Sequence, residues 1–390
     1  MGEQKRIYLD NAATSWPKPD AVYDAVDRYL RESGAPAGRS VYAEAHQANQ
    51  AVVAARTALA KFIGADDSRR VIFTLNGTES LNLALHGLLR EGDHVVTTVV
   101  EHNSVLRPLR ELESHGVQVD RVPCNVRGYV SPDDIRAAMK PNTKLVAVTH
   151  ASNVTGTVQP VAEIARIAHE RDALLLVDAA QTLGYLPVHV GELGIDLLAA
   201  PGHKGLLGPL GTGLLYIRPG LEERLVTLRQ GGTGTQSDDD RQPQTLPHKY
   251  EAGSLNVPGI VGLGAGIDFL RLQGNRLRSH HQQLTERLVA GLIEIDGVNV
   301  FGPAEPADRV GVVSVTIDRY DPQEVAAMLD GAHRVQVRAG FHCAPLMHRA
   351  IGTLDLGGAV RFSVGMFNTE ADIDAAVAAV AEVTAESAAT

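Results

Sequence analysis

Two residues of opposite charge stand where they could act on one small molecule. Asp178 ends the apolar run 174–178, and Lys204 follows the next apolar run, 195–200, after the short turn 201–203. In a parallel α/β sheet the carboxyl ends of the strands meet at one edge, and ligands bind there. A lysine amine that forms a Schiff base, together with a carboxylate that holds a proton on a pyridine nitrogen, meets the requirements of pyridoxal phosphate. Taken alone, either residue would also suit a surface lysine or a helix-capping aspartate.

The segments around these residues alternate between strand-like and helix-like patterns. Near-continuous apolar runs are typical of strands buried on both faces of a parallel sheet, whereas apolar residues at helical spacing mark the covering helices. Expected strands lie at 70–74, 94–98 and 144–149, and expected helices at 80–89, 161–168 and 282–295. This alternation predicts an α/β fold with a mainly parallel sheet.

The pattern changes towards the last third of the chain. Gly-rich and polar residues at 231–244 interrupt the alternation and would also suit a disordered linker. Beyond them, the strand-like segment 312–317 lies between helices, which predicts a smaller α+β domain. We expect a large domain over residues 18–262 and a small domain made of residues 1–17 and 263–390.

Length and composition restrict the classes of protein that fit. The chain has 390 residues, enough for two domains with hydrophobic cores, and 44% of the residues are apolar against 21% charged. A net charge of −10 argues against nucleic-acid binding. No apolar run approaches the about 20 residues of a membrane span, and residues 1–6 lack an apolar signal region. Two cysteines do not form a disulfide framework, so we expect a cytoplasmic protein, and no metal-ligand set is predicted.

The motifs occur in the order typical of a known family. From residues 8–14 to residues 361–369, the chain resembles the fold-type I pyridoxal-phosphate enzymes of the class V aminotransferase group, and within it the cysteine desulfurases. The resemblance implies pyridoxal 5′-phosphate as cofactor and a homodimer with shared active sites. It also implies that segment 231–244 lies at an active site across the dimer interface.

The resemblance implies a set of ligands for the phosphate group of the cofactor. Gly77 and Thr78 open an expected helix, where free backbone N–H groups bind phosphate. His203, and Ser254 from the second subunit, are the further phosphate ligands that the family implies. The family usually has Ser or Thr at the position of Pro201, and proline supplies neither a hydroxyl nor an N–H. We expect either weaker cofactor binding or a phosphate held by the four remaining residues.

Other positions would contact the ring of the cofactor and the substrate. The resemblance implies that His102 stacks on the pyridine ring and assists proton transfer. Asn153 and Gln181 would lie near the 3′-oxygen of the cofactor, and Asn153 also near the substrate carboxylate, although both would suit turns as well. Arg361 resembles the family arginine that grips the substrate α-carboxylate, which a guanidinium binds through two N–H groups. Lys204 would form the Schiff base and then move protons.

Cys343, in segment 338–345, decides the expected reaction. The segment resembles the desulfurase loop whose cysteine attacks the sulfur of the bound substrate, and no long insertion separates it from Arg361. Arg338 and His342 could favour the nucleophilic thiolate. The alternative is a buried structural cysteine, which is the role we expect for Cys124.

The implied activity is that of a homodimeric cysteine desulfurase, which converts L-cysteine to L-alanine and passes persulfide sulfur from Cys343 to a sulfur acceptor, for which a protein is one candidate. Selenocysteine lyase, cysteine-sulfinate lyase and class V aminotransferase activities are alternatives that keep the cofactor. A scaffold or sulfur-carrier binding subunit without cofactor is a third possibility. The pair of Lys204 and Asp178 argues against a scaffold, which needs neither residue.

Overall fold

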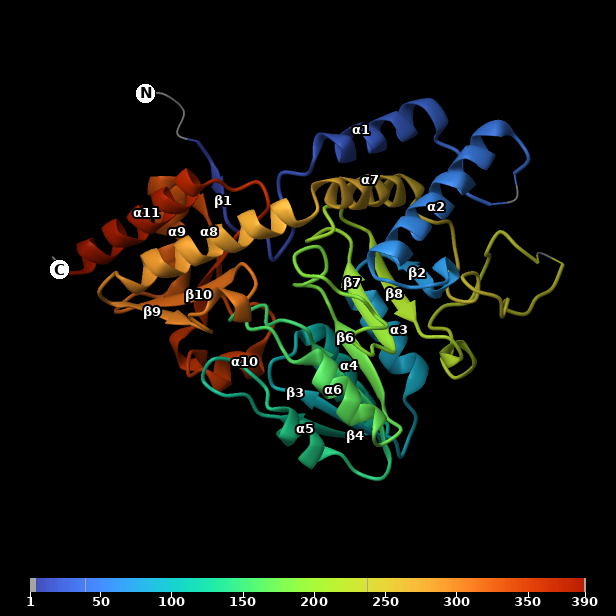
Figure 1. The fold of residues 1–390 in the computed structure, drawn as a ribbon, viewed down its shortest axis with the longest axis horizontal. Helices are drawn as coiled ribbons and strands as arrows, with labels where there is room; N and C mark the ends of the chain where they lie inside the picture. The colour runs from blue at the N-terminus through green and yellow to red at the C-terminus, as the bar shows by residue number, and fades with distance from the viewer. Residues whose placement is uncertain (1–4, 39, 237, 389–390) are drawn as a thin grey trace.

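The computed structural model describes residues 5–38, 40–236 and 238–388. Within them, the larger sheet has seven strands in the order β2-β8-β7-β6-β5-β3-β4 (Figure 1). The strands are β2 (Val71–Thr74), β3 (His94–Thr98), β4 (Gln118–Val122), β5 (Thr143–Thr149), β6 (Leu174–Asp178), β7 (Leu197–Pro201) and β8 (Gly213–Ile217). Both pairings of β8 are antiparallel, and the other pairings in this sheet are parallel. The expected α/β fold with a mainly parallel sheet is therefore confirmed.

Helices cover both faces of the large sheet. They are α2 (Ala43–Phe62), α3 (Gly77–Leu88), α4 (Asn103–Ser114), α5 (Pro132–Ala138), α6 (Val161–His169) and α7 (Val257–Gln273), and α1 (Asp20–Arg28) packs on α7. Alternate residues of one strand pack into different layers: Leu176 of β6 joins the cluster with α3 and α4, and Leu175 joins the cluster with α2, α6 and α7. Burial on both faces explains why these strands read as continuous apolar runs.

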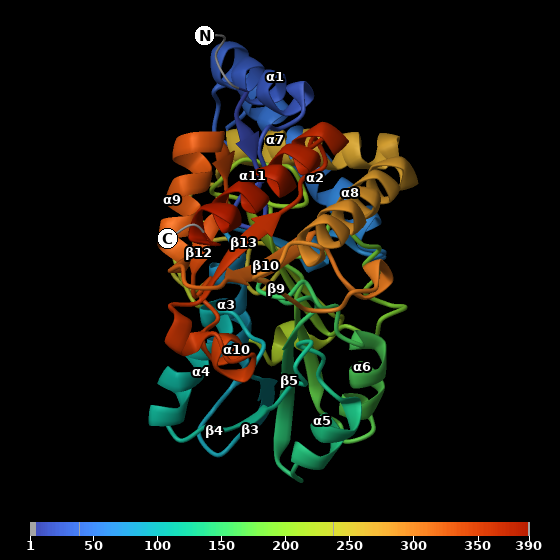
Figure 2. The same cartoon turned by 90° about the vertical axis from the view of Figure 1, so that its left-hand side faces the viewer.

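A smaller antiparallel sheet follows in the chain, with the order β12-β13-β10-β9. Its strands are β9 (Val298–Phe301), β10 (Val312–Ile317), β12 (Arg338–Gly340) and β13 (Ala359–Ser363). Helices α8 (Asn275–Ile293), α9 (Pro322–His333) and α11 (Glu370–Ala388) pack around it, as Figures 1 and 2 show. The N-terminal strand β1 (Ile7–Tyr8) pairs in parallel with β11 (Val335–Gln336), so the start of the chain joins this part of the molecule.

Helix α10 (Pro345–Ala350) connects the two sheets in space. Figure 2 shows it below the small sheet and beside helix α4. Met347 of α10 packs into the core of the large sheet. The loop that carries Cys343 therefore ends on an element that is anchored beside the large sheet.

Some boundaries in the structure differ from those expected. Helix α8 begins at Asn275, earlier than the expected 282, because its first turns are polar. The boundary expected between residues 262 and 263 falls inside α7, and the division into two domains stays a prediction. Among the described residues, no helix has the length and apolarity to cross a bilayer. Residues 1–4, on which the expectation of a missing signal region partly rests, lie outside the described residues, as does Ser237 of the polar segment.

Candidate active site

A cavity opens at the carboxyl ends of β5, β6 and β7, where α3 and α4 begin. Its lining includes most of the predicted site residues: Gly77, Thr78, His102, Asn153, Asp178, Gln181, His203 and Lys204. It also includes Asn76, Leu81, Ser104, Thr149, Ala180 and Pro201. The cavity thus lies at the edge where open α/β sheets bind their ligands.

Asp178 and Lys204 face this cavity from neighbouring strands. Asp178 ends β6, its side chain is buried, and one carboxylate oxygen accepts a hydrogen bond of 2.9 Å from the Ala180 N–H. Burial raises the pKa of the Asp178 carboxyl, while the Ala180 N–H and Lys204 act in the opposite direction. Lys204 follows β7, and burial lowers the pKa of its amine from the usual 10.5 to about 8. A larger fraction of this amine is therefore unprotonated and nucleophilic near neutral pH.

A segment near the N-terminus holds the loop that carries Lys204. The carbonyl of His203 accepts hydrogen bonds from the Ser15 N–H at 3.1 Å and the Thr14 hydroxyl at 3.1 Å. The Lys18 ammonium donates to the same carbonyl at 2.8 Å, although burial lowers the pKa of Lys18 to about 8. The Ser15 hydroxyl donates to the Lys204 carbonyl at 2.8 Å. These contacts fix the backbone at Lys204 and at the residue before it.

One end of the cavity suits an anion. Helix α3 begins at Gly77, and the first N–H groups of a helix lack partners within it and attract phosphate. A Cβ atom on Gly77 would lie 3.1 Å from the Pro201 ring, so glycine allows the start of α3 to pack closely against the end of β7. The Thr78 hydroxyl lies 2.8 Å from that of Ser104. His203 Nδ1 is buried and has no hydrogen-bond partner among the described residues, so it is free to meet a ligand.

His102 caps helix α4 with its own ring. Its Nδ1 accepts a hydrogen bond of 3.0 Å from the Ser104 N–H, so the neutral ring carries its proton on Nε2. Burial, together with the charge of Lys204, lowers the pKa of His102 to about 4. The imidazole that lines the cavity is therefore neutral near neutral pH, with its orientation set by the start of α4.

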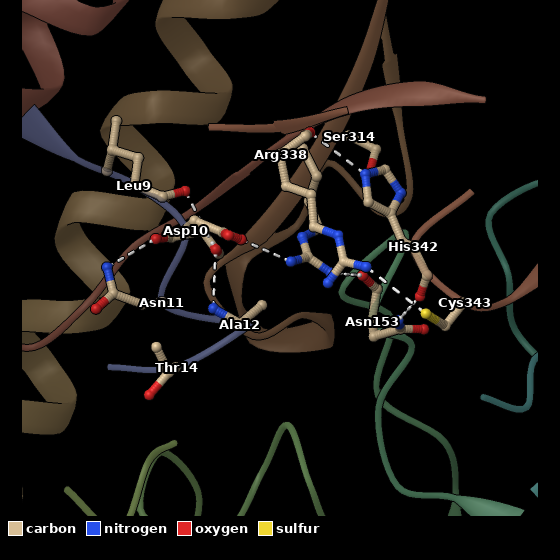
Figure 3. A network of polar contacts seen from close by, with 12 residues as sticks. Leu9, Asp10, Asn11, Ala12, Thr14, Asn153, Ser314, Arg338, His342 and Cys343 are labelled. Carbon is tan, nitrogen blue, oxygen red and sulfur yellow. Dashed lines mark hydrogen bonds and ion pairs between the residues drawn. The ribbon is translucent and has the colours of Figure 1, made fainter. Parts of the chain in front are cut away.

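The loop of Cys343 is docked onto the lining of the cavity (Figure 3). The backbone is left-handed at His342 and at Cys343, with φ values of 48° and 58°, a conformation that costs about 1–2 kcal/mol per residue. Two hydrogen bonds offset this cost: the Asn153 side-chain amide donates to the His342 carbonyl at 2.6 Å, and the Asn103 N–H donates to the Cys343 carbonyl at 2.7 Å. Arg338 Nη2 lies 3.6 Å from the Cys343 sulfur. The thiol is thereby held close to a cation and to the rim of the cavity.

The ring of His342 carries no positive charge near the Cys343 thiol. Its Nε2 donates to the Arg338 carbonyl at 3.3 Å, and its Nδ1 lies 3.2 Å from His348 Nε2. Burial lowers the pKa of His342 to about 2, so the ring is neutral. The expectation that His342 helps Arg338 to favour the thiolate is therefore wrong: the histidine contributes its backbone carbonyl and its packing, and the positive charge comes from the arginine.

Arg361 lies on β13 in contact with the loop of Asn153. Its side chain is only 1% exposed, and Nη1 donates to the Asn153 carbonyl at 3.2 Å. Nη2 forms an ion pair of 2.8 Å with the Asp10 carboxylate. Burial lowers the pKa of Arg361, and Asp10 opposes that shift. The small sheet therefore supplies a guanidinium next to a residue that lines the cavity of the large sheet.

Comparison with known proteins identifies the family. The chain matches the family model for aminotransferase class-V over residues 7–376. A probable cysteine desulfurase from Methanothermobacter thermautotrophicus is 41% identical over 372 residues, which cover 94% of this chain and 92% of that protein. This chain belongs to the cysteine desulfurase family. The resemblance seen in the sequence motifs is confirmed.

Other members of the cysteine desulfurase family match over a similar length. The cysteine desulfurase of Yersinia pseudotuberculosis is 33% identical over 385 residues, covering 96% of this chain and 92% of that protein. A solved structure of a cysteine desulfurase from Thermococcus onnurineus NA1 has a TM-score of 0.92 at 34% identity, covering 98% of this chain and 95% of that chain. The expected fold-type I architecture is confirmed.

Ser254 is a predicted cofactor ligand that does not line the cavity, and neither Arg361 nor Cys343 is part of the lining. Ser254 is exposed and lines a separate surface depression together with residues 232–235. Within one chain it therefore does not meet Lys204. Its expected role in the site of a second subunit of this cysteine desulfurase stays a prediction.

Cys124 differs from Cys343 in its surroundings. It is partly buried, and its sulfur lies 3.9 Å from that of Met347 at the edge of the large core. Burial raises the pKa of the Cys124 thiol, which makes it a weaker nucleophile. This packing agrees with the structural role expected for Cys124, although the side chain is partly rather than fully buried.

Four residues of the site escaped the sequence interpretation: Asp10, Ser15, Lys18 and Ser104. The first three contact residues almost two hundred or more positions away, so no local spacing reveals them. Ser104 could have been noticed, because it stands two residues after His102, and hydroxyl side chains are common where helices begin.

Proposed function

We propose that this member of the cysteine desulfurase family converts L-cysteine to L-alanine and receives the sulfur on Cys343. The observation that carries the proposal is the docking of the Cys343 loop onto the cavity of Lys204. Asn153 lines that cavity and donates to the His342 carbonyl at 2.6 Å, and Asn103, next to His102, donates to the Cys343 carbonyl at 2.7 Å. A cysteine with only a packing role has no need of such a location.

The residues of the cavity fit pyridoxal 5′-phosphate. A neutral His203 with an unpartnered Nδ1 and the start of α3 at Gly77 suit the phosphate group. Asp178 offers a buried carboxylate, a natural partner for a protonated pyridine nitrogen. When bound, the cofactor supplies an electron sink that weakens the bonds at Cα and then at Cβ of an amino acid. Lys204, with its lowered pKa, supplies the amine that attaches the cofactor.

The remaining predicted residues would complete the binding of cofactor and substrate. His102 would stack on the ring as a neutral imidazole, with Gln181 near the 3′-oxygen. Asn153 would lie between that oxygen and the substrate, and Arg361 would bind the substrate α-carboxylate through its guanidinium. Thr78 adds a hydroxyl for the phosphate group.

The sulfur step falls to Cys343 and Arg338. The guanidinium at 3.6 Å favours the thiolate, which attacks the sulfur of the bound L-cysteine. An S–S bond forms and the substrate C–S bond breaks. The electron pair of the broken bond stays with the substrate carbon, which takes up a proton to become the methyl group of L-alanine. Lys204 is placed to supply protons in the cavity, and the persulfide on Cys343 then passes its outer sulfur to a protein acceptor.

We also propose a cytoplasmic homodimer in which each site is completed by the other subunit. The exposed position of Ser254, away from the cavity of its own chain, supports a contribution to the partner's site. Two free cysteines support a reducing compartment.

The activity is tested by assaying L-alanine formed from L-cysteine by the purified protein with pyridoxal phosphate. We expect catalytic turnover in the wild type and in Cys124→Ala, and a loss of about a hundredfold or more in Cys343→Ala, the scale at which loss of a catalytic group acts. Selenocysteine and cysteine sulfinate serve as comparison substrates. Equal L-alanine formation by Cys343→Ala and wild type would contradict the proposal, and would favour a lyase that needs no cysteine nucleophile.

A further inference from the structure

Asp10 and Arg361 form an ion pair at the junction of the N-terminal segment and the small sheet. The distance between Asp10 Oδ1 and Arg361 Nη2 is 2.8 Å. The backbone of Asp10 is fixed, because it bridges to Ser363 on β13 and its carbonyl accepts a hydrogen bond of 3.1 Å from the Tyr8 hydroxyl. The carboxylate is thus placed beside the guanidinium by the fold.

The pair is unequal in burial. The Arg361 side chain is 1% exposed and that of Asp10 is 22% exposed, so the carboxylate can rotate towards solvent while the guanidinium cannot. A second cation, Arg338, is close enough to lower the pKa of Arg361, and Arg338 itself lies 3.6 Å from the Cys343 sulfur. Asp10 therefore offsets part of a concentration of positive charge at the rim of the cavity.

Two nitrogen atoms of the Arg361 guanidinium already donate hydrogen bonds within the protein. Nη1 donates to the Asn153 carbonyl at 3.2 Å, Nη2 donates to Asp10, and Nε is buried without a partner among the described residues. A ligand carboxylate binds most strongly when it takes two parallel N–H groups of one guanidinium. At Arg361 such a ligand must share the fork with the negatively charged Asp10, or displace it.

We propose that Asp10 competes with the α-carboxylate of the bound amino acid for Arg361 and so weakens the affinity of the site. The inference rests on the proposed role of Arg361 in substrate binding. Competition acts equally on L-cysteine and L-alanine, which carry the same carboxylate, so Asp10 keeps the product from being retained. A purely structural Asp10 has the opposite consequence: its loss would disorder the guanidinium and weaken binding.

The test measures equilibrium binding of L-alanine to the holoenzyme by isothermal titration calorimetry. Asp10→Asn keeps the shape of the side chain and an acceptor oxygen but removes the charge. We expect it to bind L-alanine about tenfold more tightly than wild type, as when a competing charged hydrogen bond is lost. Asp10→Ser, which also lacks the charge, should behave in the same way and replaces Asp10→Asn if that variant does not fold.

Two controls isolate the charge at this position. Asp374→Asn removes the same charge from a 54% exposed residue paired with Arg287 on the outer helices, and should bind L-alanine as wild type does. L-alaninamide lacks the carboxylate, so neither Asp10 variant should bind it more tightly than wild type. Unchanged or weaker L-alanine binding in the Asp10 variants, or an equal gain for L-alaninamide, would overturn the inference.

The variant Arg361→Gln distinguishes two claims: that Arg361 binds the substrate carboxylate, and that Asp10 competes with this carboxylate. We expect the variant to bind L-alanine more weakly than wild type, and Asp10→Asn to bring no gain in its background. If Arg361→Gln binds L-alanine normally, the carboxylate-binding role fails and the competition fails with it. If Arg361→Gln weakens binding but Asp10→Asn brings no gain in the otherwise wild-type protein, the competition alone fails.

Discussion

The carbonyl of Cys343 accepts a hydrogen bond of 2.7 Å from the backbone N–H of Asn103. Asn103 is the first residue of α4 and directly follows His102, whose ring lines the cavity. The bond therefore joins a loop of the small sheet to the start of a helix of the large sheet. Because one peptide group on each side takes part, this contact depends on how the two sheets pack, whereas the neighbouring bond from Asn153 to the His342 carbonyl depends on a side chain.

Arg338 should govern the reactivity of Cys343. A hydrogen bond to a charged group contributes about 1.5–3 kcal/mol, so Arg338→Met should slow alkylation of Cys343 by iodoacetamide roughly tenfold or more near neutral pH. The reaction is followed by mass spectrometry in a Cys124→Ala background. Arg349→Met removes an exposed charge from the neighbouring helix α10 and is the matched control. Equal alkylation rates in Arg338→Met and the control would show that the 3.6 Å contact has no effect on the thiol.

The lowered pKa of Lys204 predicts how cofactor capture depends on pH. Only the unprotonated amine reacts, so below its pKa the capture rate should rise about tenfold per pH unit. With a pKa of about 8 the rate should level off near that pH, whereas an ordinary lysine would continue to gain up to 10.5. The measurement is the rate of appearance of the visible absorption band when the apoprotein is mixed with pyridoxal phosphate. Lys204→Ala should fold and develop no such band.

Lys18 should be required for a stable Lys204 loop. Lys18→Met removes the ammonium that donates to the His203 carbonyl at 2.8 Å, and should lower the free energy of unfolding by about 1.5–3 kcal/mol. Denaturant unfolding of the holoenzyme measures this, with the exposed Lys61→Met as control. Lys18→Arg, which keeps a cationic donor, should recover part of the loss. Stability equal to that of Lys61→Met would contradict this role.

The sequence predicted those parts of the site whose positions depend on where individual strands end and helices begin. Asp178 and Lys204 follow apolar runs, and parallel strands necessarily bring their carboxyl ends to one edge, so their meeting follows from local pattern and topology. Gly77 stands at a helix start for the same kind of reason, whereas the role of His102 rested on the resemblance to the family.

The rest depends on packing between distant segments. Asp10 meets Arg361 because the N-terminal segment bridges to β13 at Ser363, and no spacing in the sequence predicts that pairing. The neutral state of His342 also depends on tertiary structure, because it results from burial against His348 of α10. Burial disfavours the protonated form of the imidazole, and the residue type alone does not reveal how deeply the ring is buried.

Ser254 should act in the site of the partner subunit. If Ser254→Ala and Lys204→Ala are each inactive as homodimers, mixed dimers should regain activity, because each contains one site with Lys204 from one subunit and Ser254 from the other. Random mixing should restore about a quarter of the wild-type rate for equal amounts of the two chains, since half of the dimers are mixed and each has one intact site. Two unmixed samples assayed separately are the control. No recovery in mixed dimers would place Ser254 outside the shared site.

The most direct test of the central claim is the mass of the peptide that contains Cys343 after the wild-type protein is incubated with L-cysteine. We predict an added sulfur atom on Cys343, removed by a reducing agent, and none on Cys124. The same peptide should carry no added sulfur in Lys204→Ala, because the chemistry then stops before the C–S bond breaks. Formation of L-alanine with Cys343 unmodified throughout the reaction, and with trapping by an alkylating agent also negative, would contradict sulfur transfer through this residue.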